Sequence, residues 1–225
     1  MKKRIVSLML AAALLTGAAS AAGEEGAAEQ PDLDLSAASA VLMEKETGAL
    51  LYEKESHQQL EPASVTKVMT LLLIMEDLDS GRLSKEDLVT VSAAAAGMGG
   101  SQVYLKEGEQ LSAGELIKCI AVVSGNDAAV AMAEHLAGSE AAFVERMNRR
   151  AQELGMKDTV FVNCTGLPAA GHHSSAYDIA LMSRELILHH PDIRTYTTIW
   201  MDSIRDGAFG LTNTNRLVRF YPGAT

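Results

Sequence analysis

The stretch that decides the fold is residues 62–75, PASVTKVMTLLLIM. If a helix begins at Ser64, a separation of three residues places the Ser64 hydroxyl and the Lys67 ammonium on one face, one turn apart. The residues after Lys67 are apolar on nearly every side, which predicts a buried helix with its polar groups at the N-terminal end. Burial disfavours the charged form of a lysine and lowers its pKa. The pattern therefore favours Ser64 as an acylated nucleophile and Lys67 as its base.

A structural alternative makes Ser64 a helix N-cap and Lys67 a surface residue, because short patterns of two common residue types recur by chance. The apolar run leaves little solvated face for a lysine, which weakens this alternative. At a helix start, free backbone N–H groups and the helix dipole stabilise negative charge that develops beside a serine.

The N-terminus has the layout of a secretory signal peptide. Three basic residues, Lys2 to Arg4, precede an uncharged run that is strongly apolar over 5–15 and ends in small residues near 19–21. We therefore predict a signal peptide over 1–23, a flexible acidic segment over 24–37, one domain over 38–225, and export from the cytoplasm. An uncleaved anchor is less favoured, because the apolar part is shorter than the roughly 20 residues that span a bilayer.

Composition excludes some functions. The chain has 225 residues, is 48% hydrophobic and carries a formal net charge of −10, which makes it a poor nucleic-acid binder. Its histidines include two adjacent pairs, 172–173 and 189–190, whose side chains point apart, so neither a metal site nor a cofactor is predicted. After export Cys119 and Cys164 could form a disulfide, but two separate buried thiols fit the sequence at least as well.

Periodicity and capping residues predict a mixture of helices and short strands. Ser112 with Glu115, and Ser175 with Asp178, have the spacing of helix N-caps. Helices are expected over 64–80, 112–123, 127–136, 139–154 and 175–190; strands over 39–47 and 49–55 as a hairpin, and over 88–91, 159–162, 196–201 and 215–221, with loops over 97–101 and 163–174 and a turn at 206–207.

A second polar motif, Ser124-Gly125-Asn126, lies 60 residues after Ser64 in a turn between two predicted helices. Alone it is an ordinary turn, because all three residue types favour turns. Together with Ser64-x-x-Lys67 it matches the first two of three motifs of serine penicillin-binding enzymes, S-x-x-K, S-x-N and K-T-G.

The chain resembles the D-alanyl-D-alanine carboxypeptidases, low-molecular-weight penicillin-binding proteins, over essentially everything after residue 38. The matching segments are 40–43 with Gly48, 61–64, 98–105, 124–128, 163–167, 173–176 with Asp178, and 213–217. The resemblance implies a β-lactamase/transpeptidase-like α/β (α+β) fold, in which an antiparallel sheet packs against helices beside an all-helical subdomain.

The resemblance also implies a reaction and its partners. Ser64 would attack the carbonyl between the two terminal D-alanines of a peptidoglycan stem peptide, and Lys67 would accept its proton. Ser124 would relay a proton to the leaving amine, and Asn126 with Gly125 would bind the substrate. β-Lactam antibiotics would acylate the same serine, and no cofactor is implied.

The sequence departs from the family pattern at the third motif. It contains no Lys-Thr-Gly, and no lysine follows Lys157. In the family this motif would come within a few residues of 221–224, so we expect a fragment truncated there, with an incomplete sheet and poor activity. Contact with a membrane surface is expected only through a missing C-terminal segment.

Two alternatives stay open from the sequence. A serine β-lactamase shares the first motifs, but the Glu-x-x-Leu-Asn pattern of class A enzymes is absent between Ser139 and Gly171. A long-lived penicillin adduct would favour the carboxypeptidase, and rapid turnover the lactamase. A non-catalytic wall-binding module would have lost the third motif altogether.

Overall fold

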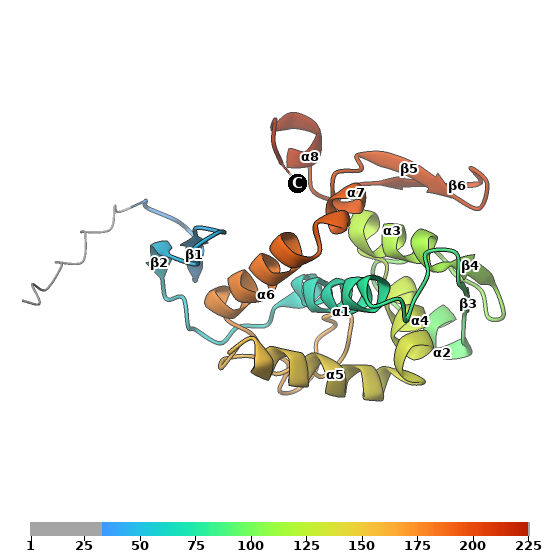
Figure 1. Ribbon diagram of the computed structural model, residues 1–225, viewed down its shortest axis with the longest axis horizontal. Helices are drawn as coiled ribbons and strands as arrows, with labels where there is room; N and C mark the ends of the chain where they lie inside the picture. The colour runs from blue at the N-terminus through green and yellow to red at the C-terminus, as the bar shows by residue number, and fades with distance from the viewer. Residues whose placement is uncertain (1–32, 225) are drawn as a thin grey trace, which may run out of the picture. The chain divides into compact units, whose positions relative to one another are not determined.

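The computed structural model describes residues 33–224 (Figure 1). The predicted signal peptide and most of the predicted flexible segment, residues 24–37, lie outside the described part. Within the described residues, no helix is both long and apolar enough to cross a bilayer.

Helices dominate the described chain, and the strands form short hairpins. The helices are η1 (Ala63–Thr66), α1 (Lys67–Asp79), α2 (Ala93–Ala96), α3 (Ala113–Val123), α4 (Asn126–Ala137), α5 (Glu140–Glu153), α6 (Ala176–His189), η2 (Pro191–Ile193), α7 (Arg194–Thr197) and α8 (Leu217–Phe220). The strands are β1 (Ala40–Met43), β2 (Leu50–Lys54), β3 (Leu88–Thr90), β4 (Gln110–Ser112), β5 (Met201–Ile204) and β6 (Phe209–Thr212).

Helix α1 lies among the other long helices and contacts α3, α4, α5 and α6 (Figure 1). Nine of its 13 residues are buried, among them Leu72 and Ile74. The prediction of a helix that is buried on nearly all sides is therefore confirmed. Helix α1 ends at Asp79, with Ser80 as its C-cap and Gly81 next in the left-handed region (φ 72°), as the sequence predicts.

The start of this helix differs from the prediction. Residues 63–66 form the 3₁₀ turn η1, and the α-helix begins only at Lys67. Ala63 has a φ of 46°, a left-handed conformation that cannot be part of a right-handed α-helix. The Ser64 hydroxyl therefore lies on a tight turn that leads into α1.

The predicted caps of the surrounding helices are present. Ser112 and Glu115 form a complete capping box at α3, and the Ser175 hydroxyl accepts the Asp178 N–H at the start of α6. Helix α4 packs against both α3 and α5. Its first eight residues are all buried, and its alanines let the neighbouring helices approach closely.

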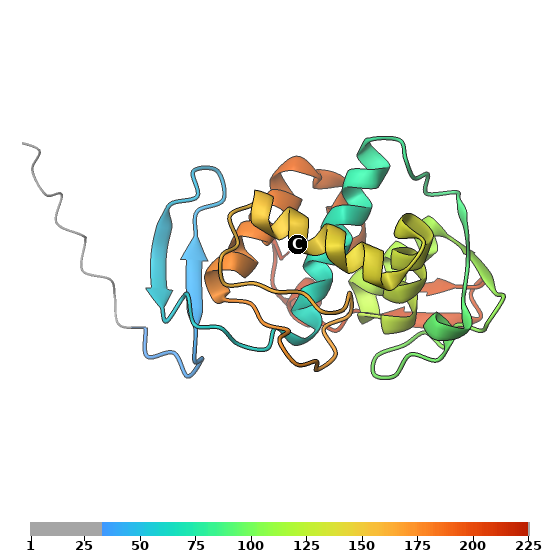
Figure 2. The ribbon, with the colours of Figure 1, turned by 90° about the horizontal axis from the view of Figure 1, so that it is seen from below.

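The strands form three separate antiparallel hairpins, β1–β2, β3–β4 and β5–β6. The predicted opening hairpin is confirmed, with Val41 opposite Glu53, and β1 lies beside α6 (Figure 2). Each sheet of the described residues has two strands, and helices supply most of the core.

Two predicted strands near the C-terminus are wrong. Residue Tyr196 lies in α7, and the strands are instead β5 and β6, which flank the predicted turn at 206–207. Residues 217–220 form α8. Asn213 and Asn215 explain that change, because their Oδ1 atoms accept the N–H groups of Asn215 and Leu217 and start a helical turn.

The predicted strand at 159–162 is reduced to one bridge, between Val160 and His173. The next two backbone N–H groups bind side chains: that of Phe161 donates to Asn148 Oδ1 and that of Val162 to His172 Nδ1. With these donors occupied, the ladder cannot continue.

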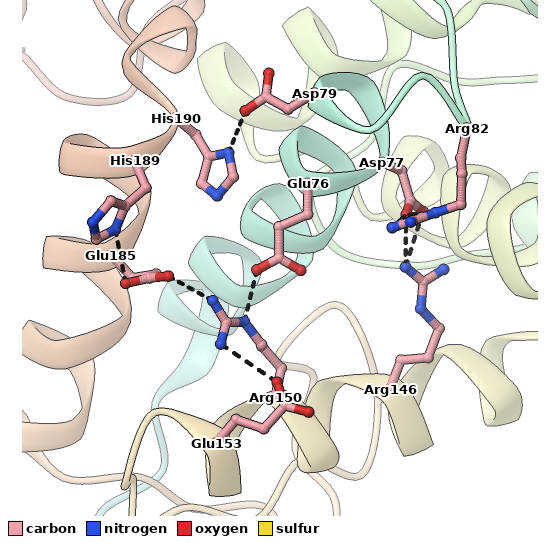
Figure 3. A network of polar contacts seen from close by, with 10 residues as sticks. All are labelled: Glu76, Asp77, Asp79, Arg82, Arg146, Arg150, Glu153, Glu185, His189 and His190. Atoms are coloured by element: carbon pink, nitrogen blue, oxygen red, sulfur yellow. Dashed lines mark hydrogen bonds and ion pairs between the residues drawn. The ribbon is translucent and has the colours of Figure 1, made fainter.

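Ion pairs join the C-terminal end of α1 to α5 and α6 (Figure 3). The Asp77 carboxylate, 2% exposed, accepts hydrogen bonds from Arg82 and from Arg146. Arg150 binds both Glu76 of α1 and Glu185 of α6. This network anchors α1 at the end opposite to Ser64.

Candidate active site

Ser64 and Lys67 come together at the N-terminal end of α1. The side chain of Ser64 is on an exposed residue, whereas Lys67 is only 3% exposed. Lys67 Nζ lies 3.4 Å from Ser64 Oγ and donates a hydrogen bond of 2.8 Å to the carbonyl oxygen of Thr165. The predicted serine–lysine pair is thus adjacent in space, with the lysine buried and the serine accessible.

The environment of Lys67 favours its neutral form. Burial lowers the pKa of Lys67 to about 8, with the Cys164 side chain acting weakly in the opposite direction. No carboxylate among the described residues contributes to the shift. At pH 7 roughly one Lys67 in ten is then neutral and able to accept a proton from the Ser64 hydroxyl.

The loop over residues 163–167 positions this lysine. Asn163 Oδ1 accepts hydrogen bonds from the N–H groups of Thr165 and Gly166 and from the Thr165 hydroxyl. The resulting turn directs the Thr165 carbonyl at Lys67 Nζ. Thr165 had no role of its own in the sequence analysis, although Asn163 and Gly166, which flank Cys164 and Thr165, are turn-forming residues.

Thr66, which lies between Ser64 and Lys67 in the sequence, is bound by His172, a residue that follows the loop over 163–167. Its hydroxyl lies 2.8 Å from Nε2 of His172, which is 4% exposed. The sequence analysis assigned no role to His172. Its signal was weak, because the partner lies 106 positions away along the chain.

The second motif forms the junction between α3 and α4. Ser124 ends α3 in the left-handed region (φ 58°), Gly125 precedes α4, and Asn126 is its first residue. Asn126 Nδ2 donates to the Gly99 carbonyl at 2.7 Å, while Asn126 Oδ1 is buried and has no hydrogen-bond partner among the described residues. One amide oxygen therefore has no hydrogen-bond partner within the described residues.

The neighbouring carboxylate secures the glycine-rich loop to this junction. Asp127 is fully buried and accepts the N–H groups of Val103, Leu105 and Ala128. The backbone N–H of Asn126 donates to the Ser101 carbonyl at 2.7 Å. The segment over 99–105 is thereby fixed against the start of α4.

The two motifs meet through Gly100. A Cβ on this glycine would lie 2.7 Å from Asn126 Nδ2 and 3.6 Å from Leu167 Cδ2. Leu167 belongs to the loop whose Thr165 carbonyl binds Lys67. Gly100 therefore lies between Asn126 and the loop that contacts Lys67. Among the described residues, no hydrogen bond joins the Ser124 hydroxyl to Ser64 or Lys67.

A comparison with protein families identifies the family of the chain. The family model described as D-alanyl-D-alanine carboxypeptidase (Peptidase_S11) matches residues 24–223. The chain belongs to the D-alanyl-D-alanine carboxypeptidase family. Among curated relatives, DacF of Bacillus subtilis is 49% identical over 226 residues, which cover 99% of the chain and 58% of DacF. The chain thus spans somewhat more than half the length of that relative.

Solved structures of penicillin-binding proteins share the fold of the chain. Penicillin-binding protein 6B of Escherichia coli superposes with a TM-score of 0.79 at 38% identity, over 85% of this chain and 62% of that one. Penicillin-binding protein D2 of Listeria monocytogenes, in its ampicillin-bound form, superposes with a TM-score of 0.75 at 31% identity. The match covers 84% of this chain and 76% of that one. The predicted β-lactamase/transpeptidase-like fold is confirmed.

Both cysteines are free and buried, so the disulfide alternative is wrong. Burial raises the pKa of both thiols, that of Cys119 to about 12. Both are therefore protonated and unreactive at neutral pH. Within residues 33–224, no group of three histidine, cysteine or acidic side chains could hold a metal ion.

Proposed function

We propose that the chain carries the acylation site of a serine-type D-Ala-D-Ala carboxypeptidase, which removes the terminal D-alanine from peptidoglycan stem pentapeptides. One observation carries the proposal. Lys67, 3% exposed and with its pKa lowered to about 8, has its Nζ 3.4 Å from the accessible Ser64 hydroxyl. Such a pair activates a serine without a histidine.

In the proposed reaction, neutral Lys67 takes the Ser64 proton while Oγ attacks the carbonyl between the two D-alanines. The N–H of Ser64, in the first turn of η1 where donors lack partners within the helix, faces the developing oxyanion. The C–N bond then breaks, D-alanine leaves with a proton relayed by Ser124, and an acyl-enzyme remains. Water hydrolyses the ester and returns the proton through Lys67.

Substrate binding is assigned to the second motif. Asn126 Oδ1, buried and without a partner, would accept an N–H of the stem peptide, which would restore its missing hydrogen bond. Gly125 would support this site by letting α3 and α4 meet closely, because a Cβ there would lie 3.1 Å from Asp127 Oδ1 and 3.5 Å from the Cys119 carbonyl oxygen. A cationic or metal cofactor has no role in this scheme.

β-Lactams are proposed as covalent inhibitors at Ser64. Attack on the lactam carbonyl opens the ring, and the amine that leaves stays tethered to the acyl group. The ampicillin- and cefotaxime-bound forms of the Listeria relative support this assignment.

The site of action is proposed to be outside the cytoplasm, where peptidoglycan lies. Residues 1–23 would act as the export signal, residues 24–37 as a linker, and residues 38–225 would contribute the catalytic domain. Expression of the full chain in a bacterial host should yield a processed protein whose N-terminus begins near residue 24. An unprocessed cytoplasmic product would contradict this part of the proposal.

The central test uses diacetyl-L-lysyl-D-alanyl-D-alanine and a fluorescent penicillin. We expect only slow release of D-alanine, because the sequence contains no Lys-Thr-Gly, and a penicillin adduct on the peptide that contains Ser64, both lost in Ser64→Ala. The adduct should persist for many minutes. Rapid penicillin turnover would instead indicate a β-lactamase, and labelling unaffected by Ser64→Ala would overturn the proposal.

A further inference from the structure

His172 uses both of its ring nitrogens inside the protein. The backbone N–H of Val162 donates to Nδ1 at 3.0 Å, and Nε2 lies 2.8 Å from the Thr66 hydroxyl. Because a backbone N–H can only donate, Nδ1 must be an unprotonated acceptor. Nε2 therefore carries the proton and donates it to Thr66 Oγ1, which defines a neutral imidazole in a single tautomer.

The residue that this imidazole holds is completely buried and lies between the candidate nucleophile and its base. Thr66 is the last residue of η1, two positions after Ser64 and one before Lys67. The connection from Thr165 to His172 therefore contacts this region at two points. The Thr165 carbonyl accepts a hydrogen bond from Lys67 Nζ, and the His172 imidazole binds the Thr66 hydroxyl.

The turn itself is strained. Ala63 has a φ of 46°, which an L-residue other than glycine adopts only when its surroundings enforce it. Contacts from outside the turn must therefore hold it. Among them, the hydrogen bond from His172 is made to Thr66, which lies between Ser64 and Lys67 in the sequence.

We infer that His172 is a positioning residue, whose neutral imidazole holds Thr66 and so keeps Ser64 Oγ within reach of Lys67 Nζ. The inference rests on the proposed function in that it takes Ser64 as the nucleophile. His172 touches neither the substrate nor the reacting atoms, so its effect passes through the geometry of η1.

The charge around His172 favours the neutral ring. Burial lowers the pKa of His172, the neighbouring His173 acts in the same direction, and Glu61 opposes both. Phe161, the aromatic neighbour, brings no charge, with its ring centroid 6.0 Å away. A protonated ring would aim a second donor at the Val162 N–H and release the turn. Loss of positioning is therefore expected only below pH 6.5, the range in which an ordinary histidine becomes charged.

The first experiment measures structure without catalysis. ¹⁵N NMR of the full chain should show His172 protonated on Nε2 at pH 7, and NMR of labelled lysine should place the pKa of Lys67 near 8. In His172→Leu, which removes both hydrogen bonds, the Lys67 pKa should rise toward the ordinary 10.5 as the turn opens to water. An Nδ1–H tautomer, or an unchanged Lys67 pKa in a folded His172→Leu protein, would overturn the inference.

The second experiment measures acylation by a fluorescent penicillin. His172→Leu and Thr66→Val should each slow acylation about tenfold to a hundredfold, because a shift of about 1 Å in a reacting group has this effect. The double variant should lose no more than the worse single one. His172→Gln keeps one donor and one acceptor without titrating, so it should retain most of the rate. Its rate should still fall with protonation of Lys67, but without the additional loss that protonation of His172 causes in the wild type.

His173→Leu is the matched control, because His173 makes its bridge to Val160 through the backbone alone. It should leave both the rate and the Lys67 pKa unchanged. A His172→Leu protein that is less stable but is acylated at the wild-type rate when folded would show a merely structural role and reject the inference. If the wild type is not acylated at Ser64, the proposed function fails, and the NMR measurements still decide the positioning role.

Discussion

The carbonyl oxygen of Ala63 lies 1.7 Å from the point where a Cβ on Gly166 would stand. Gly166 also has a φ of 82°, which side chains rarely adopt. Both effects act at the contact between η1 and the loop that holds Lys67. We predict that Gly166→Ala lowers the free energy of unfolding by about 3 kcal/mol or more and abolishes acylation of Ser64.

Gly171→Ala separates the two effects. Gly171 has almost the same φ, 84°, but no atom lies within 4 Å of its would-be Cβ. Urea unfolding should therefore show a loss of only about 1 kcal/mol, with acylation retained. Equal losses for the two variants would show that backbone conformation matters here and the close approach to Ala63 does not.

The pH dependence of acylation should follow the titration of Lys67. Only the neutral amine accepts a proton, and with a pKa of about 8 its neutral fraction rises nearly tenfold per pH unit below that value. We expect the acylation rate to rise roughly fiftyfold from pH 6 to pH 8 and then to level off. Stopped-flow measurement with a fluorescent penicillin tests this. A plateau reached only above pH 10 would contradict a buried, shifted lysine.

The free energy of unfolding should also depend on pH through the titration of Lys67. Between pH 8 and pH 10.5 the folded chain has released the Lys67 proton and the unfolded chain still binds it, so unfolding becomes less favourable as pH rises. Relative to Lys67→Met, which cannot titrate, the wild type should gain on the order of 1–3 kcal/mol across this window. Parallel urea titrations at pH 7.5 and pH 10 measure the difference. A constant difference between the two proteins would refute the assigned pKa.

What the sequence predicted well depends on short-range chemistry. The apolar run after Lys67 predicted a buried α1, and the spacing of Ser112 and Glu115 predicted a cap that forms within four residues. The lowered pKa of Lys67 followed from that burial alone. These features need only neighbours along the chain.

What the sequence could not predict depends on distant partners. The left-handed Ala63 that delays the start of α1 is packed against Gly166, about 100 positions later. Thr165 and His172 meet Lys67 and Thr66 across similar separations. Asn213 binds the carbonyl of Ile199 and helps to end the segment that had been predicted as a strand. Local propensity carries no information about such pairs.

Asn126 should affect substrate capture more than folding. Its Oδ1 has no partner, while its backbone N–H stays bonded to Ser101 whatever the side chain. We predict that Asn126→Ala lowers the second-order acylation constant roughly a hundredfold and the unfolding free energy by only about 1 kcal/mol. Asn126→Asp should be worse in both, because a carboxylate would face the Gly99 carbonyl. Similar acylation by all three proteins would remove Asn126 from the site.

Asp77, at the far end of α1, should affect the free energy of unfolding strongly and acylation little (Figure 3). Its buried carboxylate binds both Arg82 and Arg146, so Asp77→Ala leaves Arg146 without its carboxylate partner and should cost about 3–5 kcal/mol of unfolding free energy. Arg82→Ala should cost less than about 1 kcal/mol, because the Arg82 side chain is 62% exposed and Arg146 still pairs with Asp77. Under conditions where the variants are folded, both should acylate at the wild-type rate, since the ion pairs lie at the end of α1 opposite to Ser64. Slow acylation of folded Asp77→Ala would show that the position of α1 along its axis controls the Ser64–Lys67 geometry.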